Sequence, residues 1–530
     1  MKWIVLAACA VAVTAVGCTA GDSSPDAGVS NCDRSLPQKL TRDTTLLAKC
    51  SPYSVERPLT VDGFTLTIEP GVEVRFFAGA QLEAGVRVPG KVIARGTREK
   101  PISLKGSPWN GVALGMGAAG SVLENVSIED AGSVERPALS IGASDVTLKN
   151  VRVVNAKRTA LSARVDAPLK TISGLELTGD PAELVHLDVS TAGVFSTGAT
   201  LPPDAVIWLH GGLTTDVTLT DIATWRVPQT LNVDAPEGKT ASLTLKEGVR
   251  LELGERAALE FGYTRGPATF RARGTREKPA IITRYGDDPM NTPSNGLRFF
   301  GGARAPEIDW LVVEYAGALE RPAVFFNGSR GLGRVTNSVF RHMKSGAICI
   351  EAAQERFVAF DGNTFEDIEG TVLRAPLELA HNISPKNSFP PASRIEIFGS
   401  ASRDTTLTNL WMPYFVSGAL TANAGLTLER GTTLLFDDAG TLNVSAGKLT
   451  ARDATFAKAK TGWRGIEIAG TTTVKLENVT IAGVDDWALS MAPTVSGSVK
   501  KLNVKGAKKG VRSCAKKVKR DAVTPAWSCE

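Results

Sequence analysis

Histidine is scarce in this 530-residue chain, and the four copies are His186, His210, His342 and His381. No two of them have the short spacing of a zinc-binding motif. The chain also lacks a Gly-x-Ser-x-Gly segment and the Asp-rich calcium repeats of secreted β-rolls. These absences argue against the familiar zinc and serine hydrolases, and we expect no catalytic residue, no obligatory metal and no cofactor.

Aromatic residues are also few, at 6% of the chain, whereas glycine occurs 52 times. Val, Leu, Ile and Ala dominate the apolar residues, and helical patterns are scarce. This composition suits thin β coils better than a bulky globular interior. The length exceeds what one ordinary core requires, so it indicates either several domains or a repeat array that grows in one direction.

The N-terminus has the organisation of an export signal. Lys2 is followed by the apolar run 4–16, which is too short to span a membrane, and then by Gly17 and Cys18. Ala15–Cys18 resembles the bacterial lipobox, and this resemblance implies that Cys18 becomes lipidated after cleavage. Ordinary secretion with cleavage nearby is the alternative. The polar stretch 19–30 suits a flexible tether under either interpretation.

Cysteine usage fits an exported protein, in which disulfides can form. Cys32 and Cys50 lie near each other at the front of the mature chain, and Cys514 and Cys529 lie near each other at the back. We expect two disulfides that restrain the ends of a repeat array, where fraying is greatest. Cys349 stands alone in the apolar run 347–350 and is interpreted as a small buried hydrophobe without a role.

The segment 500–520 carries ten basic residues and no acidic one. Such a run can attract acidic polysaccharide, lipid headgroups or nucleic acid through charge. More often it is a solvated face, or a cap that blocks end-to-end stacking, and we favour that interpretation. This basic patch consists of Lys500, Lys501, Lys505, Lys508, Lys509, Arg512, Lys516, Lys517, Lys519 and Arg520.

Long phrases recur along the chain at large offsets, which is the signature of internal repeats. The recurring phrases include Arg42–Leu46 with Arg403–Leu407, Gly96–Pro101 with Gly274–Pro279, and Glu135–Ala138 with Glu320–Ala323. Three homologous blocks therefore cover nearly the whole mature chain. Trp109 and Trp463 occupy equivalent places in their blocks, as do Trp225 and Trp411, and we interpret this recurrence as packing at coil corners rather than stacking on sugars.

A shorter repeat lies within the blocks. Apolar residues alternate with polar ones, as in segment 64–68, and Gly, Pro or Asn turns separate the alternating stretches. Leu123–Val126 is followed by Leu148–Val151 at an offset of 25 residues. Coils of this length are expected to stack with their strands paired in parallel. The recurring Asn predicts a left-handed corner where side-chain amides bond along the axis.

The phrases Leu66–Val74 and Gly90–Thr97, with Lys100–Ile102 after them, resemble right-handed parallel β-helix proteins of the pectate-lyase-like superfamily. The resemblance spans most of residues 42–510 and is closest to bacterial surface lipoproteins of that group. It implies an all-β, right-handed parallel β-helix of roughly 20 coils, on the order of 100 Å long at about 4.8 Å a coil. It indicates architecture much better than activity.

These observations predict a division of the chain into six parts. They are the signal peptide with its lipobox Cys at 1–18, the tether and N-terminal cap at 19–41, β-helix blocks at 42–214, 215–402 and 403–513, and a disulfide-closed C-terminal cap at 514–530.

Polysaccharide-cleaving members of the superfamily use acidic Ca²⁺ ligands with a basic Arg or Lys, or clustered Asp carboxylates. Three Asp-Asp doublets occur here, at 287–288, 437–438 and 485–486, but turn formation explains them better. Three or more acidic and basic side chains converging on neighbouring coils would revive the enzyme hypothesis.

The leading hypothesis is a non-enzymatic, lipid-anchored cell-envelope protein that presents a rigid face for binding or adhesion. Its expected partners are the membrane, through the anchor, and a polysaccharide or envelope protein, with no specific nucleic acid. Thr19 stands where Asp marks inner-membrane retention in some bacteria, which favours the outer membrane. The alternatives are a divergent polysaccharide lyase, hydrolase or epimerase, and a structural scaffold of an envelope complex.

Overall fold

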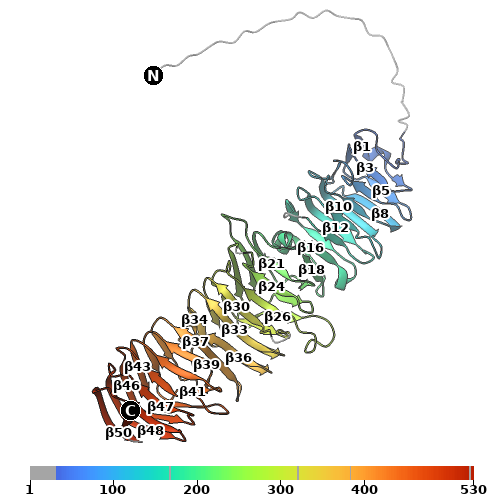
Figure 1. Ribbon diagram of the computed structural model, residues 1–530. Coiled ribbons are helices and arrows are strands. Elements are labelled where there is room, and N and C mark those ends of the chain that lie inside the picture. The colour runs from blue at the N-terminus through green and yellow to red at the C-terminus, as the bar shows by residue number, and fades with distance from the viewer. Residues whose placement is uncertain are drawn as a thin grey trace, which may run out of the picture.

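A computed structural model shows a parallel β-solenoid of about 20 turns, with one short α-helix among the residues that it describes. The structure describes residues 32–165, 169–264, 266–318, 321–381, 383–524 and 527–529. Figure 1 shows an elongated rod with β1 and β50 at opposite ends. The predicted signal peptide, Cys18 and the tether up to residue 31 lie outside the described residues. Among the residues described, no helix combines the length and apolarity that crossing a membrane requires.

The strands belong to four sheets, named A to D. Sheet A contains β1 (Thr44–Leu46), β2 (Tyr53–Val55), β4 (Thr65–Ile68), β5 (Glu73–Phe76), β7 (Lys91–Arg95), β8 (Ile102–Trp109), β10 (Val122–Ala131), β12 (Thr147–Val154), β14 (Thr171–Ser173), β15 (Leu175–Leu177) and β17 (Ala199–Thr200). Sheet B contains β3 (Leu59–Val61), β6 (Leu82–Ala84), β9 (Val112–Leu114), β11 (Leu139–Ile141), β13 (Leu161–Ala163), β16 (Val185–Asp188), β18 (Val206–His210), β20 (Thr224–Val227), β23 (Arg250–Leu253), β26 (Ala280–Arg284), β29 (Leu311–Glu314), β32 (Val339–Met343) and β35 (Thr364–Ile368).

Sheets C and D begin in the second block. Sheet D contains β19 (Asp216–Leu219), β22 (Ala241–Lys246), β25 (Ala268–Arg273), β28 (Glu307–Asp309), β31 (Arg334–Thr336) and β34 (Ala359–Asp361). Sheet C contains β21 (Leu231–Val233), β24 (Ala258–Phe261), β27 (Gly296–Phe299), β30 (Val324–Ser329), β33 (Gly346–Ala353), β36 (Thr371–Pro376), β37 (Arg394–Ala401), β38 (Thr405–Leu407), β39 (Tyr414–Ala422), β40 (Leu426–Leu428), β41 (Thr433–Phe436), β42 (Thr441–Val444), β43 (Lys448–Arg452), β44 (Thr455–Lys458), β45 (Ile466–Ile468), β46 (Thr473–Ala482), β47 (Trp487–Met491), β48 (Ser496–Lys505), β49 (Lys509–Ser513), β50 (Lys517–Thr524) and β51 (Trp527–Ser528). The helical segments are α1 (Ala192–Gly198) and the 3-10 turns Ala48–Cys50, Pro181–Glu183, Val189–Thr191 and Leu377–Ala380.

Neighbouring coils pair in register, and this confirms the coil predicted from the sequence. Leu123 on β10 lies opposite Leu148 on β12, at the predicted offset of 25 residues. Asn125 and Asn150 both have φ near +50°, and the Asn150 side-chain amide donates to Asn125 Oδ1 at 3.1 Å. The predicted left-handed Asn corner with amides bonded along the axis is therefore confirmed at these coils.

Apolar side chains alternate into the interior and stack from coil to coil. In the second block, Phe261, Phe299 and Phe326 form an inward ladder with ring centroids 5.2 Å and 4.8 Å apart. Each ring is fully buried, and burial of this apolar area stabilises the coil. The residues preceding them on β24, β27 and β30 must point outward, because side chains on a strand alternate between its two faces. This alternation places the candidate site on the outside of sheet C.

Candidate functional site

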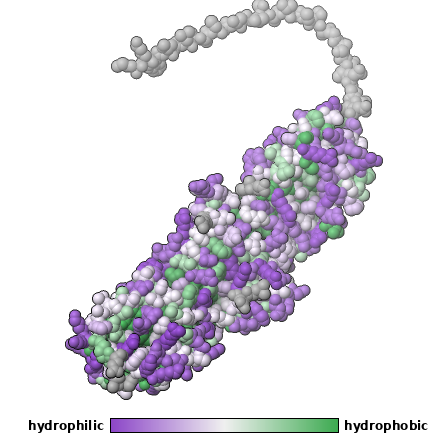
Figure 2. Space-filling model, viewed as in Figure 1, coloured by the Kyte–Doolittle hydropathy of each residue, from purple (hydrophilic) through white to green (hydrophobic). Residues whose placement is uncertain are grey.

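A row of outward side chains crosses sheet C in the second block. Glu260 lies opposite Arg298, Arg298 opposite Phe325, Phe325 opposite Cys349, and Cys349 opposite Arg374. These five residues line a cavity of about 580 Å³, together with Arg321 and Glu351 among others. Hydrophilic residues are spread along the visible face of the rod (Figure 2), so polar character alone does not single out this cavity.

Arg298 is the most unusual residue of the cavity, because its side chain is charged yet only 3% exposed. One guanidinium nitrogen, Nη1, donates to the Pro322 carbonyl at 2.6 Å. The other, Nη2, is buried and has no hydrogen-bond partner among the described residues. Burial, together with the positive charge of Arg321, lowers the pKa of Arg298 to about 10. A buried donor without an acceptor is costly, so this nitrogen is suited to an acceptor from outside the chain.

The acidic groups of the cavity leave this guanidinium without a close counter-ion. No carboxylate lies within ion-pair distance of Arg298 in the described part of the chain. Glu260 and Glu351 likewise have no basic side chain within that distance there. Burial raises the pKa of Glu260, and the charges of Arg298 and Arg321 oppose that rise. The cavity therefore holds separated acidic and basic groups from neighbouring coils.

The Arg374 side of the cavity is held rigidly. Its Nε donates to Glu396 Oε1 at 3.0 Å, and its guanidinium carbon lies 4.1 Å from the centroid of the Phe398 ring. Arg374 also approaches the Cys349 sulfur at 3.9 Å. Cys349 is half-buried and not part of the inward core as expected, because Ile348 and Ile350 take the inward positions and alternation turns Cys349 toward the cavity. Burial among its neighbours raises the pKa of this thiol, so it has little thiolate character.

Aromatic rings flank the same cavity. Phe300 and Phe325 line it, and Tyr263 packs edge-on against Phe300 with ring centroids 5.1 Å apart. Tyr263 is 60% exposed, so part of its ring is available to a ligand. A buried guanidinium beside exposed aromatic surface is an arrangement that can bind an acidic sugar, whose carboxylate pairs with Arg and whose ring stacks on an aromatic side chain.

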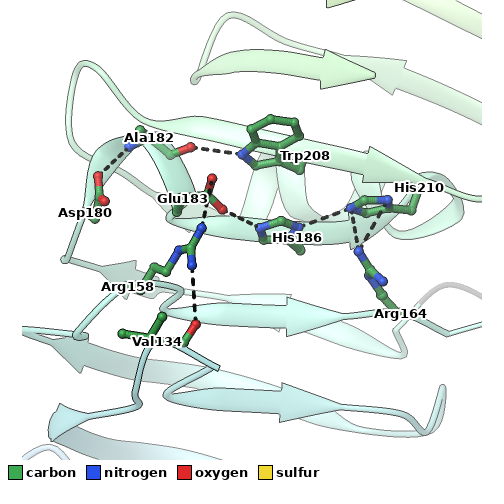
Figure 3. A network of polar contacts seen from close by, with 9 residues as sticks. All are labelled: Val134, Arg158, Arg164, Asp180, Ala182, Glu183, His186, Trp208 and His210. Atoms are coloured by element: carbon green, nitrogen blue, oxygen red, sulfur yellow. Dashed lines mark hydrogen bonds and ion pairs between the residues drawn. The ribbon is translucent and has the colours of Figure 1, made fainter. Parts of the chain in front are cut away.

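A second polar network lies on sheet B of the first block (Figure 3). His186 Nε2 lies 3.2 Å from Glu183 Oε2, and His186 Nδ1 lies 3.2 Å from His210 Nε2. Arg164 Nη2 donates to His210 Nε2 at 2.9 Å. Burial lowers the pKa of His210 to about 4, helped by the positive charge of Arg164, and burial also lowers the pKa of His186. Both rings are therefore neutral near pH 7.

The histidine pair shows what sequence reasoning missed. Metal-binding motifs in sequences have short spacings, whereas His186 and His210 are 24 residues apart, which is the length of one coil. The same kind of signal identifies the cavity, since Cys349 and Arg374 are 25 residues apart. Within the described ranges, no three His, Cys, Asp or Glu side chains are grouped so that they could hold a metal ion.

The cysteines at both ends are placed as predicted. Cys32 is bonded to Cys50, and Cys514 to Cys529, so the two end disulfides are confirmed in the structure. Cys18 lies outside the described residues. Lipidation stays a prediction.

The basic patch gathers on the last coils, and all ten of its residues are exposed. Lys508 pairs with Asp485 at 3.2 Å and Lys509 with Asp486 at 2.9 Å. The other eight have no ion pair among the described residues, and Arg512 donates to the Ser490 hydroxyl instead. None of the ten lies in the cavity on sheet C.

The recurring tryptophans divide into two groups. Trp109, Trp225 and Trp463 are fully buried, and each indole nitrogen donates to a backbone carbonyl. Their predicted packing role is confirmed. For Trp411 that prediction is wrong, because its side chain is 85% exposed at a corner where its backbone has φ of +63°.

The geometry of the site is the only guide to ligand chemistry, because comparison with known proteins gives no relative. No protein-family model, curated protein or solved structure matches the chain.

Proposed function

We propose that this protein is a lipid-anchored cell-envelope protein that binds an acidic glycan in the cavity on sheet C. The observation that carries the proposal is the buried Arg298 guanidinium, whose Nη2 has no acceptor among the described residues. A ligand carboxylate would supply that acceptor together with the missing counter-charge. Charge-assisted bonds of this kind are short and strong, particularly where water is excluded.

The neighbouring groups define the class of ligand. Phe300 and Phe325 offer aromatic surface to a sugar ring, while Glu260 and Glu351 offer acceptors for sugar hydroxyls. Arg321 and Arg374 add positive charge at the rim. A uronic acid residue of a polysaccharide meets these requirements, since it carries one carboxylate, several hydroxyls and an apolar ring face.

The anchoring part of the proposal rests on the N-terminal sequence alone, namely the export signal and Cys18. A rod tethered at one end would present its lateral faces to polymers around it. The outer membrane is the proposed location, with the lipid anchor as the membrane partner.

Calorimetric titration of the protein from Ser23 onward with oligogalacturonate tests the binding proposal. We expect binding by the unaltered protein and a loss of at least ten-fold in affinity for Arg298→Gln, because one charge-assisted contact is removed. Arg152→Gln is the matched control, since Arg152 is exposed on sheet A and pairs with Glu176. Equal affinities for all three proteins would contradict the proposal and shift weight to a protein scaffold.

A second candidate function is cleavage of the bound glycan by a divergent lyase, hydrolase or epimerase. It is favoured by the convergence of Glu260, Arg298, Glu351 and Arg374 from neighbouring coils. Release of unsaturated or reducing ends during incubation with polygalacturonate would support cleavage, and retention without release would support binding alone.

A further inference from the structure

The first and second blocks carry the same outward row on different sheets. In the first block, Glu83 lies opposite Ala113, Ala113 opposite Ser140, Ser140 opposite Ser162, and Ser162 opposite His186. In the second block the row is Glu260, Arg298, Phe325, Cys349 and Arg374. The recurring phrase Glu135–Ala138 leads into Ser140, and its copy Glu320–Ala323 leads into Phe325. The two rows are therefore equivalent in repeat position, but Ala113 stands where the second block has Arg298.

The arginine of the recurring phrase lies near the acidic end of both rows. Arg136 reaches back over β6, where it bonds Gln81 and lies 3.7 Å from Glu83. Arg321 lines the cavity beside Glu260, the residue equivalent to Glu83. The Pro after each arginine lines the adjoining hollow in both blocks.

The first-block row also adjoins a hollow, with a volume of about 170 Å³. Its polar lining includes the hydroxyl groups of Ser133, Thr159 and Ser162, the guanidinium groups of Arg136 and Arg164, and the His186 imidazole. Glu135 also lines it. Ser162 takes the place of Cys349 in this row, and His186 takes the place of Arg374, so a cationic or hydrogen-bonding group closes the row in both blocks.

Arg164 is exposed, and it lines this hollow. It has no carboxylate within ion-pair distance in the described part of the chain, and its hydrogen bonds go to the His210 ring. Figure 3 shows that Arg158, by contrast, points toward Glu183, from which it lies 3.7 Å away. An exposed guanidinium without an acidic partner is suited to an oxyanion ligand.

We propose that this hollow is a second binding site for an acidic group, which faces a different side of the rod from the cavity on sheet C. The inference rests on the proposed function, because the ligand class is taken from the equivalent cavity. The first-block strands β6, β9, β11 and β13 belong to sheet B, whereas their equivalents β24, β27, β30 and β33 belong to sheet C. One rod therefore holds two acidic chains at once and cross-links them.

The third block shows that the site is not a general property of the repeat. Its equivalent loop carries Asp485 and Asp486 in place of the Glu-Arg-Pro phrase. Both carboxylates face that part of the surface and pair with Lys508 and Lys509. The third block therefore lacks a copy of the phrase that adjoins both hollows, and we assign two sites to the chain.

Calorimetric titration with trigalacturonate tests the assignment through stoichiometry. We expect two molecules bound per chain by the unaltered protein and by the control Arg152→Gln, one by Arg164→Gln, one by Arg298→Gln, and none by the double variant. Arg164 and Arg152 are both exposed, so their substitution leaves the fold intact, and thermal unfolding of each variant verifies this.

The outcomes separate the inference from the proposed function. One molecule bound by the unaltered protein, lost in Arg298→Gln and kept in Arg164→Gln, overturns the second site and leaves the proposed function standing. An absence of binding overturns both.

Cross-linking provides an independent measurement with long polygalacturonate. Light scattering should rise on mixing with the unaltered protein, and excess trigalacturonate should reverse the rise. Single-site variants should give no rise, and a rise with Arg164→Gln equal to that of the unaltered protein would contradict the inference.

Discussion

Trp109 stacks on Phe76 with ring centroids 4.1 Å apart and an interplanar angle of 12°. Trp463 stacks on Phe436 at the same distance in the third block, at 8°. The two pairs are repeat copies of one packing unit, since Trp109 and Trp463 hold equivalent places in the sequence. Each indole also caps a backbone carbonyl of the next coil, Glu129 and Ala482 respectively. The unit joins two coils through both apolar contact and a hydrogen bond.

Replacement of Trp109 by Ala should therefore destabilise the first block by about 3–5 kcal/mol, the usual cost of removing a large buried ring. Trp411→Ala, at the exposed corner, should change stability by less than about 0.5 kcal/mol. Denaturant unfolding gives the two values, and hydrogen exchange should place the loss near β5, β8 and β10. Equal effects of the two substitutions would contradict this interpretation.

The left-handed Asn corner allows two substitutions at one position to be compared. Asn125 has φ of +50°, donates to the Gly96 carbonyl at 3.0 Å and accepts from Asn150. Asn125→Ala loses both bonds and strains the left-handed backbone, whereas Asn125→Gly loses the bonds but tolerates the backbone. We expect Ala to be worse than Gly by about 1 kcal/mol in unfolding free energy. The opposite order would mean that the corner is not held by its backbone conformation.

The repeat unit could be predicted from the sequence because alternation, offset and Asn position all depend on local spacing. Leu123 and Leu148 occupy the expected register, and the end disulfides join the expected cysteines. The outward side of Cys349 also follows from local pattern, because Cys349 alternates with the inward residues Ile348 and Ile350. Local pattern was sufficient for each of these features.

The candidate site could not be predicted in the same way, because it depends on how coils stack. Arg298 and Arg374 come from coils that are not adjacent, and only the register between coils brings both to one cavity. The passage of equivalent rows from sheet B to sheet C depends on the junction between blocks, where β21 begins a new sheet. No repeated phrase in the sequence marks that change.

The histidine pair makes the stability of the first block depend on pH. Burial lowers the His210 pKa to about 4 from its ordinary 6.5, and it lowers that of His186 as well. The unfolded chain binds protons to these rings first, so stability is full above pH 6.5 and declines as the pH falls toward about 4. Glu183 favours protonation of His186, while Arg158 and Arg164 oppose it.

Thermal unfolding should therefore show a lower transition temperature at pH 5 than at pH 7, and the double variant His186→Gln, His210→Gln should reduce that difference. Glu378, whose pKa is lowered to about 2, loses its contribution only below its ordinary value of 4.5, which is a separate window. A difference of the same size in the unaltered protein and the double variant would rule out the pair as its source.

Arg298 should separate stability from binding. Met has a similar length and no charge, so Arg298→Met removes the cost of burying the guanidinium, although the Pro322 carbonyl loses its donor. We expect the transition temperature to stay unchanged or rise while binding of oligogalacturonate at the cavity on sheet C is lost. A marked fall in transition temperature would show that the arginine is retained for the fold, which would weaken the argument for a ligand.

The C-terminal disulfide should stabilise the last coil alone. Cys514 and Cys529 are 15 residues apart, and closing a loop of that size contributes about 3 kcal/mol through the unfolded chain. In a solenoid each coil contacts only its neighbours, so the double variant Cys514→Ser, Cys529→Ser should lose hydrogen-exchange protection in β50 and β51 and keep it in β24 to β36. The exposed cations of β50 add to this loss of protection, because Lys517, Lys519 and Arg520 repel one another on the terminal coil.

The matching variant Cys32→Ser, Cys50→Ser should loosen β1 and β4 at the other end instead. Loss of protection along the whole rod in either variant would show that the solenoid unfolds as one cooperative unit, in which an end disulfide stabilises every coil.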